Sequence, residues 1–92
     1  MGRVAEIIRA KLRDGLQPIR LDIVDESHRH AGHAGARPEG ESHFQVAIVA
    51  AAFAGQSRVA RQRLVYALLA DELRTDIHAL SLTTLTPDED RG

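Results

Sequence analysis

Cysteine is absent from the 92 residues of this chain. Without thiols the chain has no disulfide framework, no thiolate nucleophile and no thiolate metal site of its own. Tryptophan is also absent and aromatic residues make up only 3%, which argues against aromatic stacking platforms for single-stranded nucleic acid. These absences exclude several common classes of redox, metal-binding and nucleic-acid-binding protein.

The chain also lacks a surplus of charge of either sign: it has 12 Lys and Arg residues and 13 Asp and Glu residues, so the net charge is -1. This balance excludes nucleic-acid binding by bulk charge, although a local basic face stays open. The longest uncharged apolar stretch, residues 46–55, would cover about half a membrane span. Residues 1–10 carry charges throughout and show no secretory signal, so we expect a cytoplasmic protein without a membrane partner.

Hydrophobic residues account for 43% and charged residues for 27%, which is typical of a single globular domain. Apolar residues at helical spacing predict a helix over 4–14, ended by Gly15. Alternation with a period of two then predicts strands over 19–24 and 44–50. We expect these two strands to form an antiparallel hairpin.

The second half of the chain repeats the change from helical to strand periodicity. A broad apolar face predicts a helix over 59–74, capped by Ser57 and with a bend or a short first helix before Arg63. A last strand follows over 77–85, and residues 88–92 form a flexible acidic tail after a domain spanning 1–87. The sequence therefore predicts an α+β fold of α-β-β-α-β or α-β-β-α-α-β order, with a three-stranded sheet and helices on one face.

Histidine is concentrated in the polar segment between the first two strands. His28, His30, His33 and His43 fall within 16 residues, and His78 begins the last strand. Their spacing suits either a metal-binding loop for zinc or copper or a set of solvated side chains. The ring of His78 shares parity with the core-facing leucines, so it is either a structural residue or a ligand. Because iron–sulfur clusters need thiolates, this chain could add only imidazoles to a cluster whose thiolates a partner supplies.

The stretch from residue 43 to 70 contains no acidic residue, and its only formal charges are Arg58, Arg61 and Arg63. Cations at the start of a helix oppose its dipole unless an anionic neighbour is present. This pattern favours an anionic partner, with DNA as one candidate. No catalytic triad or phosphate loop is visible, so we expect no enzymatic activity.

Several motifs, in order from residue 4 to 87, are similar to those of the BolA family. In the first half these are Asp25-Glu26-Ser27, the His-Ala-Gly-His run at 30–33 and Gly40-Glu41-Ser42-His43-Phe44. In the second half they are Phe53-Ala54-Gly55-Gln56-Ser57, Arg61-Gln62-Arg63-Leu64-Val65-Tyr66, Leu69-Ala70-Asp71-Glu72-Leu73, Ile77-His78-Ala79-Leu80-Ser81-Leu82 and Thr86-Pro87.

The resemblance implies an α-β-β-α-α-β fold like a type II KH domain without its glycine clamp. It also implies a partnership with monothiol glutaredoxins, with or without a bridging [2Fe-2S] cluster whose thiolates come from the glutaredoxin and glutathione. The chain's ligands would be His78 and a histidine of the first loop, either His30 or His33.

Some members of the family regulate transcription by binding DNA through a helix-turn-helix-like region. In this chain that region would lie around Arg58, Arg61 and Arg63. The family often has Arg-His-Arg where this sequence has Arg61-Gln62-Arg63, so a role for a histidine at that place does not carry over.

Overall fold

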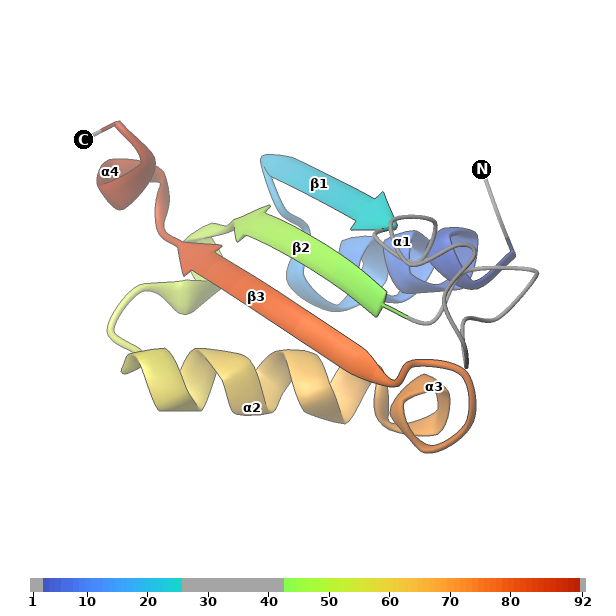
Figure 1. Cartoon of the computed structure of the whole chain (residues 1–92). Helices are drawn as coiled ribbons and strands as arrows, with labels where there is room; N and C mark the ends of the chain where they lie inside the picture. The colour runs from blue at the N-terminus through green and yellow to red at the C-terminus, as the bar shows by residue number, and fades with distance from the viewer. Residues whose placement is uncertain (1–2, 26–42, 92) are drawn as a thin grey trace.

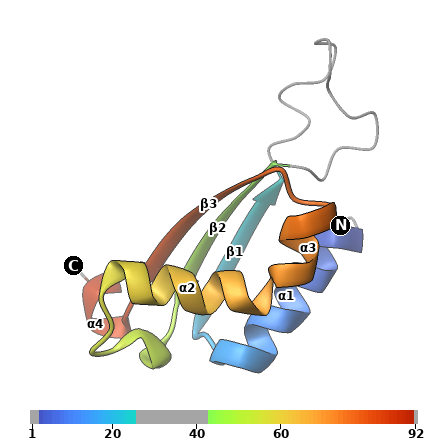
Figure 2. The same ribbon diagram turned by 90° about the horizontal axis from the view of Figure 1, so that it is seen from below.

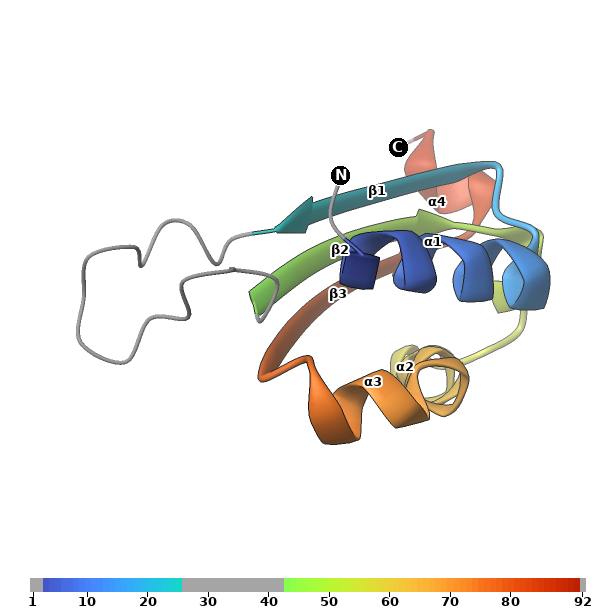
Figure 3. The ribbon, with the colours of Figure 1, turned by 90° about the vertical axis from the view of Figure 1, so that its right-hand side faces the viewer.

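The computed structural model describes residues 3–25 and 43–91. A three-stranded sheet has the order β1-β2-β3, with β1 (Arg20–Asp25) antiparallel to β2 (His43–Val49) and β3 (Ala79–Leu85) parallel to β2. The helices α1 (Arg3–Leu16), α2 (Arg58–Leu68) and α3 (Ala70–Thr75) cover one face of this sheet (Figures 1 and 3). The predicted α+β class, the antiparallel β1–β2 pair and the α-β-β-α-α-β order are confirmed.

The core lies between the sheet and the three helices. From α1 it takes the apolar row predicted by helical spacing, and from β2 the alternating residues that face the helices. The fully buried large side chains are Ile8, Leu12, Phe44, Val46, Ile48, Val49, Phe53, Val65 and Leu69. Burial of such side chains is the main stabilising contribution in a domain of this size.

The first helix ends later than the glycine predicted. Gly15 lies inside α1, which continues to Leu16, and Gln17 takes the left-handed conformation with φ 48°. Position 15 suits glycine because α2 lies close by: a Cβ atom there would be 2.7 Å from both Cδ atoms of Leu68. Gly15 therefore allows α1 and α2 to approach closely, and the prediction that it ends the helix is wrong.

The helical region over 59–74 is divided, but not where the sequence indicated. The side chain of Ser57 accepts a hydrogen bond from the Ala60 amide at 3.1 Å, which confirms the predicted cap of α2. The bend comes at Leu69, with φ -106° and ψ 19°, rather than before Arg63. Leu69 is fully buried, so the change of direction lets both α2 and α3 pack on the sheet.

The acidic C-terminal residues, predicted to be a flexible tail, instead form the short helix α4 (Pro87–Asp90). The side chain of Thr86 accepts from the Glu89 amide at 3.2 Å, and the Glu89 carboxylate accepts from the Thr86 amide at 2.8 Å. Asp90 also pairs with Arg20 at 2.9 Å. This capping box and the ion pair give the segment order that its composition did not predict.

No helix in the described ranges, 3–25 and 43–91, is long and apolar enough to cross a membrane. The apolar stretch noted over 46–55 instead contains most of β2 and the single-turn helix η2 (Ala51–Phe53).

Candidate functional site

The two described histidines meet at one end of the sheet. His43 begins β2 and pairs in register with Ala79, while His78 immediately precedes β3. Their ring centroids are 6.3 Å apart, in an edge-to-face arrangement at 66°. Parallel pairing of β2 and β3 therefore brings together two imidazoles that are far apart in the sequence.

The orientation of His78 differs from that expected from strand parity. His78 is exposed, whereas Ile77 is buried at 3% exposure. A bend at His78 interrupts the alternation before β3 begins, so parity with Leu80 does not extend back to it. The side chain is accessible from solvent, and its ring does not point into the core.

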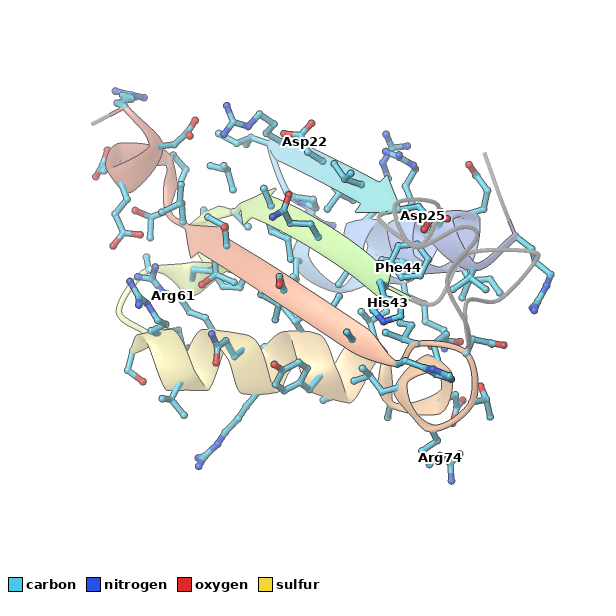
Figure 4. The ribbon with its side chains drawn as sticks, in the orientation of Figure 1. Asp22, Asp25, His43, Phe44, Arg61 and Arg74 are labelled. Atoms are coloured by element: carbon cyan, nitrogen blue, oxygen red, sulfur yellow. The ribbon has the colours of Figure 1, made fainter. Side chains whose placement is uncertain are left out.

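His43 was not among the ligands expected from the sequence, which were His78 and either His30 or His33. It lies next to Phe44, which is 2% exposed and faces the core, so the side chain of His43 is directed to the opposite face of the sheet (Figure 4). Alternation in the sequence already indicated this orientation. Only the strand pairing reveals its neighbour.

His30 and His33 lie outside the described residues. The residues that border this segment, Asp25 and His43, lie at the same end of the sheet, because Asp25 pairs in register with Phe44. Within the described part of the chain there is no group of three or more histidine and carboxylate ligands. Imidazole is a ligand for iron, so the exposed His78 has the chemistry of a ligand to a metal centre that takes its other ligands from elsewhere.

The three arginines of the basic helix differ in their surroundings. Arg58 and Arg63 are exposed, but the side chain of Arg61 is only 11% exposed. The guanidinium of Arg61 donates to the carbonyl oxygens of Gln56 and Thr84 at 2.9 and 3.0 Å. It also lies 5.9 Å from the centroid of the Phe53 ring.

Arg61 also has the anionic neighbour that its place on the helix called for. Its Nη1 and Nη2 donate to the Oε1 and Oε2 atoms of Glu89 at 2.7 and 3.3 Å. The hydrogen bond from Arg61 comes first among the causes that lower the pKa of Glu89 from 4.5 to about 2, followed by that from the Thr86 amide. Arg61 thus ties α2 to β3 and α4, and it is not a free cation for a partner.

The histidine pair and Arg61 lie at opposite ends of the sheet. His43 is at the start of β2, whereas Arg61 contacts Thr84 near the end of the parallel strand β3 (Figure 4). The imidazole site and the basic site are therefore separate surfaces, and a partner could occupy either one alone.

Together these observations define the class of protein: a small α+β domain with a three-stranded mixed sheet, helices on one face and, at one end, an exposed histidine beside a partly buried one. A family model described as BolA-like protein matches residues 12–89. The BolA domain of SufE1 from Arabidopsis thaliana has a TM-score of 0.84 and 46% identity, and covers 97% of this chain and 98% of that one. This chain belongs to the BolA family.

The relatives carry different names. SufE-like protein 1, chloroplastic/mitochondrial, of Arabidopsis thaliana is 49% identical over 86 residues, which are 89% of this chain and 23% of that protein. Protein BOLA1, chloroplastic, of the same plant is 49% identical over 87 residues, covering 92% of this chain and 54% of that protein. The DNA-binding transcriptional regulator BolA of Escherichia coli strain K12 is 45% identical over 89 residues, covering 97% of this chain and 81% of that protein. The chain thus spans about a quarter and about half of the first two relatives.

Proposed function

We propose that this chain is a non-enzymatic, cytoplasmic partner of monothiol glutaredoxins that contributes histidine ligands to a bridging [2Fe-2S] cluster in iron–sulfur trafficking. The ligands would be His78 together with His30 or His33. A glutaredoxin cysteine and glutathione would supply the thiolates that this chain lacks.

The observation that carries the proposal is the exposed position of His78. It lies at the end of the sheet that also holds Asp25 and His43, the residues on either side of the segment 26–42. An imidazole there is accessible to a second protein. The ring of the partly buried His43 lies 6.3 Å away between ring centroids and adds a second imidazole to this end of the sheet. When bound, a cluster would supply one-electron chemistry or serve as cargo, and the residues of this chain would hold and orient it.

The test is a titration of the full chain into cluster-loaded monothiol glutaredoxin, followed by visible absorption and circular dichroism. We expect a new spectrum that saturates at a ratio of one to one, and we expect His78→Ala to abolish it while far-ultraviolet dichroism stays native. His28→Ala is the matched control, since it removes an imidazole from the same polar segment without touching a proposed ligand. An unchanged spectrum with the parent chain, or a full response from His78→Ala, would refute the proposed ligation.

A second candidate function is DNA binding, which two observations favour. Arg58 and Arg63 are exposed on α2 in a stretch without acidic residues, and the relative from Escherichia coli is named as a DNA-binding transcriptional regulator. Because Arg61 is held by Glu89, we assign direct phosphate contacts only to Arg58 and Arg63.

This candidate predicts a salt-dependent affinity. Each lost phosphate contact should reduce the slope of log K against log salt by about 0.9. Replacing Arg58 and Arg63 together by alanine should therefore flatten the slope measured by fluorescence anisotropy with duplex DNA. Arg74→Ala is the control, because it removes the same charge from α3, where Arg74 pairs with Asp71 at 2.8 Å. Equal slopes for the parent and the double variant would exclude this interface.

A further inference from the structure

The outer edge of β3 is open along the side that faces α2 (Figures 1 and 2). Within residues 3–25 and 43–91, β3 pairs only with β2. The carbonyl of Leu85 accepts from the Ala50 amide at 2.9 Å and so faces inward, whereas the carbonyl of Thr84 accepts from Arg61 and faces outward. Alternation along the strand then directs the peptide groups of Leu82 and Leu80 to the open edge as well.

The strand itself carries none of the residues that usually protect an edge against strand pairing. The sequence of β3, ALSLTTL, contains no charged residue and no proline, and its exposed positions hold the small side chains of Ala79, Ser81 and Thr83. Edge strands that must stay unpaired generally carry lysine, proline or a bulge. Among the described residues, the Arg61 guanidinium occupies the edge at its Thr84 end.

A groove accompanies the open edge. One hollow of about 260 Å³ lies between α2 and the strand, and its lining residues are Arg58, Gln62, Leu82, Thr83, Thr84 and Leu85. The helical spacing of Arg58, Gln62 and Tyr66 puts these side chains in one row along α2. Tyr66 is 40% exposed but does not line the hollow, so the row offers the cation of Arg58 and the amide of Gln62 to a ligand lying along β3.

Charge indicates what kind of ligand the groove would take. Arg58 is exposed, and no ion pair joins it to another residue of the described ranges. At the Thr84 end a second hollow, of about 460 Å³, is lined by Arg58, Arg61 and Glu89 among others. The carboxylate of Glu89 already pairs there with Arg61, so this end of the groove binds an acidic segment of the chain itself.

We propose that the groove between α2 and the open edge of β3 binds an extended acidic segment of a partner protein. The segment would pair with the free amide and carbonyl groups of Leu80 and Leu82 and place a carboxylate on Arg58. Main-chain pairing gives affinity in this mode of recognition, and the row on α2 gives selectivity. A peptide is favoured over a nucleic acid because the edge presents backbone groups, and because Glu89 neutralises the neighbouring arginine.

The test uses the full chain labelled with ¹⁵N and a short synthetic peptide of alternating threonine and valine that ends in two glutamates. We expect saturable shifts of the Leu80, Leu82 and Thr84 amides. Arg58→Glu should weaken the peptide about tenfold or more, since it replaces a charge-assisted contact by repulsion. Arg63→Glu makes the same charge change on α2 outside the residues that line the hollow, and should leave the affinity within about threefold of the parent, as for a remote surface charge.

Four results would overturn the proposal: no saturable shift, equal weakening by the two charge reversals, shifts at the β1 edge instead, or shifts of these amides by duplex DNA but not by the peptide. The readout is independent of the cluster titration, because it follows backbone amide shifts with the peptide alone and involves neither glutaredoxin nor a cluster. Failure of one proposal is therefore distinguishable from failure of the other.

Discussion

Arg61 on α2 and Glu89 on α4 form a two-point ion pair across 28 residues of sequence, with Nη1–Oε1 and Nη2–Oε2 distances of 2.7 and 3.3 Å. Arg61 also donates to the Thr84 carbonyl, so the pair connects a helix, the end of β3 and the C-terminal segment. Arg61, which the sequence analysis treated as a cation for binding a partner, therefore connects parts of the fold. Its anionic partner, Glu89, lies in the acidic segment that was expected to be a flexible tail.

The ionisation of Glu89 should make stability depend on pH in the acid range. Its pKa is about 2 in the folded chain, against an ordinary value of 4.5 for a glutamate carboxyl, so the unfolded state binds more protons between these values. The stabilisation is complete above pH 4.5 and is lost as the pH falls toward 2. Denaturation of the parent and of Glu89→Gln should therefore give stabilities that differ near pH 6 and converge toward pH 2.

Asp88→Asn is the matched control for this prediction, because it removes one carboxylate from α4 without touching Arg61. Its effect on stability near pH 6 should be smaller than that of Glu89→Gln. A parent-minus-Glu89→Gln difference that stays constant from pH 6 to pH 2 would contradict the role given to this carboxylate.

Lys11 should stabilise the contact between α1 and α3 through Glu72. The Lys11 Nζ lies 2.9 Å from both carboxylate oxygens, and Glu72 is only 8% exposed. Lys11→Met keeps most of the apolar stem but leaves this carboxylate without its partner, which should cost about 1–3 kcal/mol in urea denaturation.

The exposed pair Arg74–Asp71 provides the comparison, with side chains 76% and 72% exposed. Arg74→Met should change stability by less than about 0.5 kcal/mol, since surface pairs one helical turn apart contribute little. Similar losses for the two substitutions would mean that the burial of Glu72 has no energetic consequence.

We expect that position 15 favours glycine because of the contact with Leu68 and not because the helix ends there. Gly15→Ala would gain about 1 kcal/mol of helix propensity, but the new methyl group would overlap Leu68, and overpacking costs about 1–3 kcal/mol. Because the crowded atoms are the ends of the Leu68 side chain, we expect Gly15→Ala to be less favourable in the parent than when Leu68 is alanine. A double-mutant cycle measured by urea denaturation gives this coupling directly, and equal effects of Gly15→Ala in both backgrounds would exclude the contact.

His43 should influence the proposed cluster through its neighbour rather than as the second ligand. In the glutaredoxin titration, His43→Ala should retain the new absorption bands with altered ellipticity, because only the ring beside His78 is removed. Loss of the bands in His43→Ala, with full responses from His30→Ala and His33→Ala, would transfer the ligand role to His43.

Periodicity was sufficient to predict most of the elements, because the alternation of apolar residues reflects which face each element buries. Strand β1 was predicted within one residue at each end, as was β2, and the Ser57 cap follows from local hydrogen bonding alone. The limits appeared where a distant residue decides the local structure. Gly15 lies inside α1 and close to Leu68 of α2, and the bend falls at the buried Leu69, so both positions are decided by contacts that periodicity does not show.

The candidate site shows the same division. The sequence by itself determined that the chain supplies no thiolate ligand, since it has no cysteine, and it determined the α+β class through its periodicity. Only the tertiary structure decided which side chains meet. Parallel pairing of β2 with β3 brings His43 beside His78, and the position of α4 allows Glu89 to pair with Arg61. The sequence alone does not show these contacts, because they depend on strand register and helix placement rather than on sequence distance.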